Sequence, residues 1–508
     1  MIDKHVFKTL IYREMDEGNN DYWFDFKQQK YLHNIDTYYY SVDIVKDEEG
    51  SFELFIADLK KDKEVAQKTD FKNSSAGSQY VCNGYSFGIY KYDIELPDEY
   101  LILVAEIVPN DNTPYIIVQL RSYYLWLHGV AKALEYSVND LKKILDKYDI
   151  AILQIKSNRI DFCWHTNYIQ NLELFFNPKN IAQMRVSRLK EFDMHGKFVG
   201  DEGVEFDYLR MGRLTSNNII FRAYLKSKEV VEMGYKPWFL KIWLFHGLIS
   251  RYDFYVYEEC FLRGSWEYLH KARLKFYYEH GADIKIKNRI AGYLNEQSGT
   301  GINDYDDLVE FADELTPKVN MILNFEYQTK RKFFSSINFV NFKNREGLMS
   351  EVMTELDFRP LIIDYLTNET LRFVEKSKES NDSNKSRRDF APFWERLRRT
   401  KLVDVIIPPE QIKLVREYNN NLNKEFVKLN AARAISTFSV YENRSGTTVF
   451  EDILEFMSAL NDNDMYKLKM YKYKKMHLLN NKIETDASVE YNRPVYGVVN
   501  LETGEIFT

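Results

Sequence analysis

The chain has 508 residues, 45% of them hydrophobic and 29% charged, the composition of a globular protein of roughly two to four domains. Its net charge of −7 excludes a global basic field, so any nucleic-acid-binding surface has to be local. Three scattered cysteines exclude a disulfide framework and a cysteine zinc site, and they fit a reducing cytoplasm. The N-terminus lacks the apolar core of a signal peptide, and no apolar run is long enough to cross a bilayer, so we expect no membrane partner.

Short β-rich runs separated by turns are predicted before the first long helix. The polar Asp-Glu-Glu-Gly at 47–50 lies between the first two runs, as in a β-hairpin, and a polar loop at 72–79 precedes the other three. The predicted strands are 36–45, 51–59, 84–92, 100–108 and 115–122. A helix is predicted from Ser137, which has Asp140 three residues later as an imperfect capping box.

A further strand is predicted at 155–165, Ile-Lys-Ser-Asn-Arg-Ile-Asp-Phe-Cys-Trp-His. Successive side chains of a strand point to opposite faces, so Arg159, Asp161 and His165 share one face. A carboxylate in so apolar a strand is costly unless it is paired or holds a metal ion. A structural pair of Asp161 with Arg159 and a metal-ligand role for Asp161 both stay open at this point.

The stretch 218–226, Asn-Ile-Ile-Phe-Arg-Ala-Tyr-Leu-Lys, is also predicted to be a strand, because Ile, Phe and Tyr favour a half-buried sheet. Arg222, Tyr224 and Lys226 share one face of it. A tyrosine between two cations would tolerate both a phenolate and a phosphate. The alternative is a surface strand whose cations extend into solvent.

A third strand of this kind is predicted at 250–257, with Arg251 and Asp253 on one face. If the three strands are neighbours in one sheet, Asp161, Asp253 and Tyr224 converge. Mg²⁺ is commonly held by one or two carboxylates plus substrate phosphate, and a tyrosine hydroxyl can attack phosphorus to form a phosphotyrosine. Such a site would cut a DNA strand and keep the bond energy for resealing.

The order of these motifs resembles the Rep_trans family, which comprises rolling-circle replication initiators of small Gram-positive plasmids and related relaxases of integrative conjugative elements. Trp243 and the similar segments lie within residues 80–262, about a third of the chain. The segments are Arg-Ile-Asp-Phe at 159–162, Gly-Arg-Leu-Thr-Ser at 212–216, Phe-Arg-Ala-Tyr-Leu-Lys at 221–226 and Arg-Tyr-Asp-Phe at 251–254. The resemblance implies that Tyr224 is the nucleophile, that Arg222 and Lys226 flank it, and that Ser216 is the turn serine.

The resemblance also implies a Mg²⁺ or Mn²⁺ site made by strand acids. Asp161 and Asp253 fall on these acids, although Asp253 is one methylene shorter than the usual glutamate. His165 stands where relatives often have a second aspartate, and imidazole can ligate Mn²⁺. On an ideal strand His165 lies about 13 Å from Asp161, so a ligand and an ordinary polar residue both stay open for it.

The implied fold is α+β, an antiparallel-sheet nicking domain followed by a mostly helical C-terminal half. The polar stretch 376–389 is the best candidate linker, and the basic stretch 465–482 is either a DNA-contacting segment or a solvated amphipathic helix. We expect a β-rich segment at 1–75, the nicking domain at 76–262, a helical region at 263–377 and a helical DNA-binding or assembly domain at 388–508. Within the C-terminal half, helices are predicted at 409–429 and 448–460, and a hairpin after Val489.

The expected function is a rolling-circle replication initiator, an enzyme that nicks one strand at an origin, forms a 5′-phosphotyrosine and a free 3′-OH, and later rejoins the strand. Its expected partner is single-stranded or supercoiled origin DNA, with a host helicase and a second copy of the chain as further candidates. A conjugative relaxase with the same chemistry, a catalytically inactive origin-binding protein and a virion protein stay open as alternatives.

Overall fold

The computed structural model describes most of the chain between residues 30 and 507. The described ranges are 30–45, 50–69, 72–110, 113–169, 177–189, 191–199, 203–214, 218–232, 236–263, 265–280, 284–294, 305–340, 346–376, 384–400, 413–416, 424–442, 448–461, 464–465, 467–472, 489–492, 498–499 and 506–507. The chain divides into two compact units, one formed by residues 1–334, 343–410 and 494–508, the other by 335–342 and 411–493.

Nine strands form one sheet in the first unit, and all its recorded strand pairings are antiparallel. In chain order they are β1 (Tyr31–Ile44), β2 (Tyr90–Leu96), β3 (Tyr100–Ala105), β4 (Ile116–Leu120), β5 (Ile152–Thr166), β7 (Phe192–Val199), β8 (Gly203–Met211), β9 (Ile219–Leu225) and β10 (Leu323–Lys330). Their order across the sheet is β2-β3-β4-β1-β5-β10-β9-β8-β7. This mixture of helices and antiparallel sheet is consistent with the predicted α+β class.

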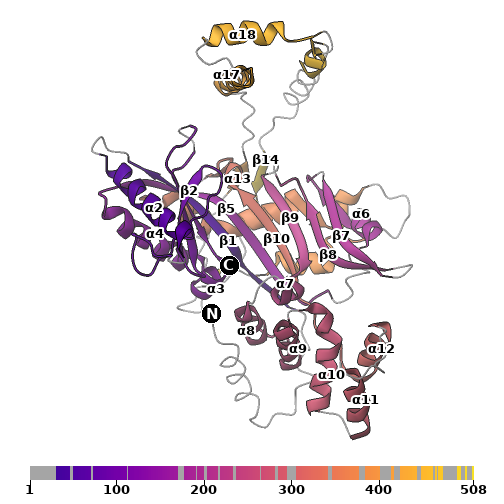
Figure 1. Cartoon of the computed structure of the whole chain (residues 1–508). Helices are drawn as coiled ribbons and strands as arrows, with labels where there is room; N and C mark the ends of the chain where they lie inside the picture. Colours follow the sequence, from indigo (N-terminus) through magenta and orange to yellow (C-terminus); the bar gives the residue numbers. More distant parts are fainter. Residues whose placement is uncertain are drawn as a thin grey trace. The chain divides into compact units, whose positions relative to one another are not determined.

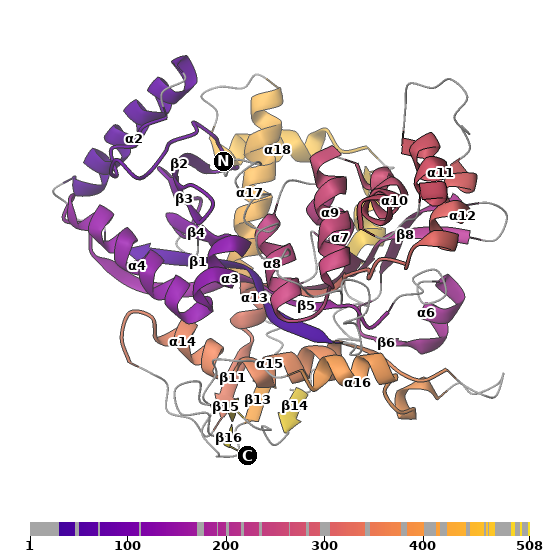
Figure 2. The ribbon, with the colours of Figure 1, turned by 90° about the horizontal axis from the view of Figure 1, so that it is seen from below.

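Most of the regular secondary structure of the first unit outside this sheet is α-helical. They are α2 (Ser51–Lys68), α3 (Ser122–His128), α4 (Val130–Asp146), α6 (Pro178–Met184), α7 (Lys226–Glu232), α8 (Pro237–Phe245), α9 (Arg251–Arg263), α10 (Leu269–His280), α11 (Ile284–Leu294), α12 (Tyr305–Leu315), α13 (Arg331–Phe334), α14 (Ser350–Asp357), α15 (Arg359–Tyr365) and α16 (Pro392–Arg398). Helices α14, α15 and α16 lie on one side of the sheet, and α7, α8 and α9 lie on the other (Figures 1 and 2).

The central strands β5, β10 and β9 have one apolar face, which packs on α16. Phe221, Phe325 and Tyr327 contact Trp394 of this helix at ring-centroid distances of 5.9, 6.2 and 6.5 Å. Trp394 is fully buried, and its Nε1 donates to the backbone carbonyl of Thr367 at 2.9 Å. The apolar face is therefore part of the packed core, and the polar side chains of these strands lie on the opposite face.

The predicted strand at 250–257 is wrong, because these residues belong to helix α9. Ser250 and Asp253 form a capping box: the Ser250 amide donates to Asp253 Oδ2 at 2.7 Å, and the Asp253 amide donates to Ser250 Oγ at 3.1 Å. Nine consecutive residues of the helix, 252–260, are buried. Burial on all sides removes the polar face that would reveal a helical period in the sequence.

Two other predicted elements are also replaced. The stretch 51–59 begins helix α2 instead of a strand, because Phe52, Phe55, Ile56 and Leu59 are spaced for one helical face and are buried on it. Within 263–377, where we expected a helical region, β10 enters the sheet between β5 and β9. Ser265 caps a helical turn at Trp266–Tyr268, which continues into α10.

The second unit contains a three-stranded sheet of β11 (Ile337–Val340), β13 (Lys413–Arg416) and β14 (Val489–Asn492), together with α17 (Lys424–Tyr441) and α18 (Val449–Ser458). The helix predicted at 409–429 is wrong where β13 lies. The helix predicted from Thr448 is confirmed as α18, with Thr448 and Glu451 in a capping box. In the first unit, Val498–Val499 pairs with Ile506–Phe507, in agreement with the hairpin expected in the tail.

Within the described ranges, no helix combines the length and apolarity needed to cross a membrane. The cysteines Cys82, Cys163 and Cys260 are free and buried.

Candidate functional site

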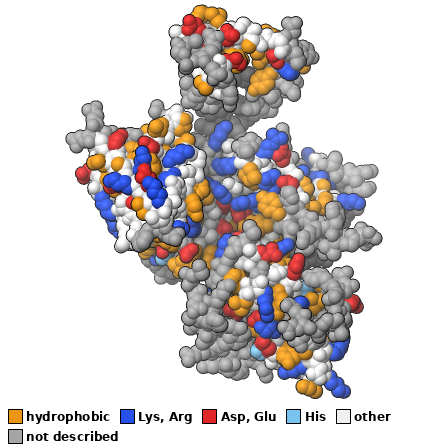
Figure 3. Space-filling model, in the orientation of Figure 1, with side chains coloured by type: hydrophobic (Ala, Val, Ile, Leu, Met, Phe, Trp, Pro, Cys, Tyr) orange, Lys and Arg blue, Asp and Glu red, His pale blue; other side chains and the backbone are white. Residues whose placement is uncertain are grey.

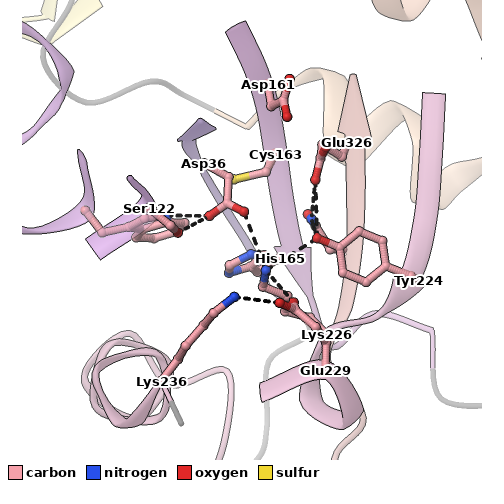
Figure 4. Close-up of polar contacts among 12 residues, drawn as sticks. Asp36, Ser122, Asp161, Cys163, His165, Tyr224, Lys226, Glu229, Lys236 and Glu326 are labelled. Carbon is pink, nitrogen blue, oxygen red and sulfur yellow. Dashed lines mark hydrogen bonds and ion pairs between the residues drawn. The ribbon is translucent and has the colours of Figure 1, made fainter. Parts of the chain in front are cut away.

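The polar face of β5, β10 and β9 holds the predicted tyrosine and one predicted acid (Figure 4). In the sheet register, Tyr224 lies opposite Asn324, and Arg222 lies opposite Glu326. On the other side of β10, Glu326 lies opposite Cys163, two residues from Asp161. Directly opposed residues on neighbouring strands share a face, so β10 brings Glu326 between the side chains contributed by β9 and β5.

The Tyr224 hydroxyl is held by three side chains. It donates to Glu326 Oε2 at 3.2 Å, and it accepts from Asn324 Nδ2 at 2.9 Å and from Lys226 Nζ at 3.3 Å. Burial raises the pKa of Tyr224 well above that of a free phenol, and Lys226 opposes this rise. The phenol is therefore protonated at rest, with a carboxylate in place to take its proton and two donors in place to stabilise its anion.

Lys226 is 1% exposed and lies between two acids. Its Nζ is 3.5 Å from Asp36 Oδ2 and 2.6 Å from Glu229 Oε2. Burial acts to lower the pKa of Lys226, but Asp36, Tyr224 and Glu229 outweigh it and raise the pKa well above its usual value. Lys226 is thus a fixed cation beside the phenol oxygen.

Asp36 occupies an irregular position in β1, where the register against β5 shifts between Ile35 and Thr37. Its Oδ1 accepts from the Ser122 hydroxyl and from Trp126 Nε1, the latter at 3.2 Å. The bulge turns Asp36 out of simple alternation. This is why the sequence alone did not mark it as a partner of Lys226.

Asp161 and Glu326 form a buried acid pair bridged by arginine. Arg222 Nη2 lies 3.3 Å from Asp161 Oδ2 and also donates to Glu326 Oε1. Arg159 Nε donates to Asp161 Oδ1 at 2.9 Å, so the predicted structural pair of these residues is present as well. Burial and the nearby Glu326 carboxylate raise the pKa of Asp161 to about 7, although both arginines oppose this shift.

His165 lies on β5, four residues after Asp161, but it is fully buried among aromatic rings. Trp126 stacks on it at 5.0 Å, and Trp243 Nε1 donates to its Nδ1 at 3.1 Å. An indole N–H can only donate, so in the neutral imidazole the proton sits on Nε2. Burial and the nearby Lys226 lower the pKa of His165 to about 3. In this tautomer His165 offers no lone pair to a metal ion from Nε2.

Asp253 does not join the acid pair. It is fully buried at the start of α9, where its carboxylate accepts from the amide and hydroxyl of Ser250 at 2.7 and 2.8 Å. It also accepts from the amide and Nδ2 of Asn320 at 2.9 and 2.8 Å. The prediction that Asp253 lies on a strand beside Asp161 is therefore wrong. Its carboxylate oxygens accept hydrogen bonds from Ser250 and Asn320 instead.

The sequence interpretation missed Glu326, Asn324 and Asp36, all of which surround Tyr224 or Lys226. The alternation in Leu-Asn-Phe-Glu-Tyr-Gln-Thr at 323–329 is a strand pattern and could have revealed Glu326. Ser216, the predicted turn serine, lies outside the described residues.

The three predicted metal ligands do not assemble. Across the described residues, no three or more His, Cys, Asp and Glu side chains gather in a group that could hold a metal ion. One observation nevertheless fits a divalent cation: Asp161 Oδ2 and Glu326 Oε1 converge on a single cationic nitrogen of Arg222. Two carboxylates plus substrate phosphate are a common donor set for Mg²⁺.

On the surface of this side of the molecule, acidic side chains lie in a recess with Lys and Arg side chains beside it (Figure 3). Arg159 and Arg222 are 25% and 23% exposed, whereas Asp161 and Glu326 are 2% and 3% exposed. An anion approaching the acid pair therefore meets guanidinium groups first.

No family model matches the chain, and no curated protein matches it. Among solved structures, the chain is similar to a rolling-circle replication initiator protein from Geobacillus stearothermophilus, with a TM-score of 0.33 and 11% sequence identity. The similarity covers 72% of this chain and 95% of that chain. This structural similarity is weak.

Proposed function

We propose that the protein is a DNA strand transferase that nicks one strand through Tyr224, as a rolling-circle replication initiator does. The observation that carries this proposal is the environment of the Tyr224 hydroxyl. One carboxylate oxygen accepts its proton, two side-chain donors face its oxygen, and a second carboxylate lies beyond Arg222. A tyrosine kept only for packing needs neither the buried lysine nor the buried glutamate.

The proposed reaction is a transesterification at phosphorus. The Tyr224 oxygen forms a bond to phosphorus while its proton passes to Glu326 Oε2, which lies 3.2 Å away. The bond from phosphorus to the 3′-oxygen breaks, and that oxygen takes up a proton to become a 3′-OH. The phosphodiester becomes a 5′-phosphotyrosine, so the reverse attack by a 3′-OH rejoins the strand without an external energy source.

Lys226 and Asn324 act on the charge that develops on the phenol oxygen. Both point a hydrogen-bond donor at it, and Lys226 stays charged because Asp36 and Glu229 hold it. Fixed donors in a buried site stabilise a developing anion more than mobile water does. Arg222, which is partly exposed, is the proposed contact for the scissile phosphate.

A divalent cation, Mg²⁺ or Mn²⁺, belongs to the proposal with a changed ligand set. Asp161 and Glu326 would hold it, in place of the predicted set that included Asp253 and His165. Such an ion would polarise the phosphoryl oxygens and stabilise the charge of the in-line displacement.

The test is covalent adduct formation with labelled single-stranded oligonucleotides that tile the protein's own replicon, with Mg²⁺ or Mn²⁺ added. We expect the wild-type protein to form an adduct that survives denaturing electrophoresis and Tyr224→Phe to form none. Tyr208→Phe is the matched control, because Tyr208 lies opposite Tyr224 on β8. Equal behaviour of wild type and Tyr224→Phe would refute the tyrosine assignment. Sequence-selective binding without any adduct would favour an inactive origin-binding protein.

A further inference from the structure

We propose that Arg222 exchanges its contacts with Asp161 and Glu326 for a DNA phosphate, so that DNA and the divalent cation bind together and not independently. Without DNA, its guanidinium fills the place between Asp161 and Glu326. With DNA, it turns to the phosphate and leaves both carboxylates free for the cation. This inference rests on the proposed function, since it concerns the same site.

The first support is that one nitrogen occupies the point where both acids converge. Arg222 Nη2 is 3.3 Å from Asp161 Oδ2 and donates to Glu326 Oε1. A divalent ion that uses both carboxylates needs the same point. Because Arg159 also pairs with Asp161, keeping Arg222 in place would leave two guanidinium groups and a divalent ion on two carboxylates. Four positive charges against two negative ones in a buried site are strongly unfavourable.

The second support is access. The Asp161 and Glu326 side chains are 2% and 3% exposed, and Arg222 is 23% exposed. Arg222 is thus the most accessible of the three side chains, and its Nη2 contacts both acids. A solute can reach the converging oxygens readily only if the guanidinium moves.

The third support is that the present contacts of Arg222 leave it incompletely satisfied. Its Nε is buried and, among the described residues, has no hydrogen-bond partner. The fork of Nε and Nη donors matches two oxygens of a phosphate, and such paired bonds are among the strongest that arginine makes. A phosphodiester therefore offers Arg222 a contact that the resting site does not complete.

The exchange makes the coupling reciprocal. If DNA raises the affinity for the cation by some factor, the cation raises the affinity for DNA by the same factor. We expect this factor to be about 10- to 100-fold, within the range typical of coupled sites.

The experiment measures Mn²⁺ binding by electron paramagnetic resonance on the full-length chain, in a Tyr224→Phe background that prevents cleavage. The DNA probe is single-stranded dT20, and dT20 with an uncharged methylphosphonate backbone tests the need for phosphate charge. Adding dT20 is expected to tighten Mn²⁺ binding about 10- to 100-fold, and the uncharged strand is expected to have no effect. Absence of any dT20 effect on Mn²⁺ affinity would overturn the proposal.

Substitutions of Arg222 separate the exchange from a general electrostatic effect. Arg222→Gln is expected to bind Mn²⁺ without DNA as tightly as the unsubstituted protein does with DNA, and to gain nothing further from dT20. Arg222→Lys keeps a cation between the acids and is expected to stay weak without DNA, which serves if the glutamine variant fails to fold. If Arg222→Gln folds and binds Mn²⁺ no more tightly without DNA, the proposal is wrong.

Arg210→Gln is the matched control for lost positive charge. Arg210 lies opposite Arg222 on β8, has the same 23% exposure, and pairs with Asp193 instead of the acid pair. It is expected to keep the full dT20 effect on Mn²⁺ binding. The adduct assay reports on Tyr224 and the Mn²⁺ titration reports on Arg222, so either idea can fail while the other stands.

Discussion

Two segments of the chain share the pattern Arg-x-Asp within an apolar, aromatic run, and the fold uses them in opposite ways. Arg159-Ile-Asp161 lies in β5, where spacing by two puts both side chains on one face and they pair at 2.9 Å. Arg251-Tyr-Asp253 lies in the first turn of α9, where Asp253 caps Ser250 and Arg251 is exposed. Asp161 lies on the face of the sheet that carries Tyr224. Asp253 has a structural role at the start of a helix.

The comparison shows that the residues preceding an Arg-x-Asp motif help to decide whether its aspartate lies in a strand or caps a helix. Ser250 stands three positions ahead of Asp253 and completes a capping box, a recognised helix-start signal. Asn158 stands three positions ahead of Asp161 inside strand β5, where the register against β1 shifts, and residues 159–162 after it alternate polar and apolar side chains. An acid in a capping box is therefore a weaker candidate for catalysis than the same acid in an alternating strand.

The largest expected effect that separates the two acids comes from Asp161→Asn. Adduct formation should fall about 10²- to 10³-fold, because the site loses one of two carboxylates that balance its cations and would hold the divalent ion. The free energy of unfolding should not fall below the wild-type value, because burial and the Glu326 carboxylate raise the pKa of Asp161 and so disfavour its charged form in the folded protein. Urea denaturation and the adduct assay on the same preparation check both parts.

Asp253→Ala should show the reverse pattern. We expect the free energy of unfolding to fall by about 2–3 kcal/mol, because a helix cap is lost and buried donors of Ser250 and Asn320 lose their acceptor. Adduct formation per folded molecule should stay within about twofold of wild type, as expected for a site that Asp253 does not touch. Arg251→Ala controls for the segment and should change stability by less than about 0.5 kcal/mol. If folded Asp253→Ala lost adduct formation, Asp253 would belong to the catalytic site and this interpretation would be wrong.

A smaller, pH-dependent effect is expected from His165, which shares β5 with Asp161 yet is structural in our interpretation. Its pKa in the folded protein, about 3, lies below the usual 6.5, so between these values the unfolded chain binds more protons. The stability that His165 contributes should therefore be full above about pH 6.5 and decline as the pH falls, by at most about 1.4 kcal/mol per pH unit.

His165→Gln should flatten that decline, because glutamine does not titrate and can still accept from Trp243. Urea titrations at pH 7.0, 5.5 and 4.5 would measure the pH dependence of the free energy of unfolding in both proteins. Burial also lowers the pKa of His33 to about 3, so the histidine part of the slope should be halved in His165→Gln and removed in the variant that also lacks His33. An unchanged slope in His165→Gln would show that His165 is not the buried neutral base described.

The sequence predicted the parts of the site that depend on local alternation. Asp161, Arg222 and Tyr224 lie on the polar face of their strands because apolar residues alternate with them at 159–162 of β5 and 221–225 of β9. Alternation could have marked Glu326 as a strand residue, but its strand lies about a hundred residues beyond Tyr224, inside a stretch expected to be helical, and alternation does not reveal which strands are neighbours. Asp36 was missed because a bulge, which has no simple sequence signature, aims it at Lys226.

Helix α9 was missed for a different reason. Tyr, Phe and Val favour strands, and an element buried on every side shows neither the twofold nor the 3.6-residue period. Only the cap at Ser250 distinguishes it. Packing against neighbouring helices, which no local pattern encodes, overrides the intrinsic strand preference of these residues.

The position of β10 has a consequence for biosynthesis. Until the ribosome has released residues 323–330, β5 and β9 each present an open edge where β10 belongs, and the glutamate opposite Arg222 does not yet exist. Native pairing across so long an interval is slow to form and leaves exposed edges prone to wrong partners. The same delay means that a nascent or prematurely terminated chain carries Tyr224 without Glu326, so under the proposed function incomplete products should form no covalent adduct with DNA.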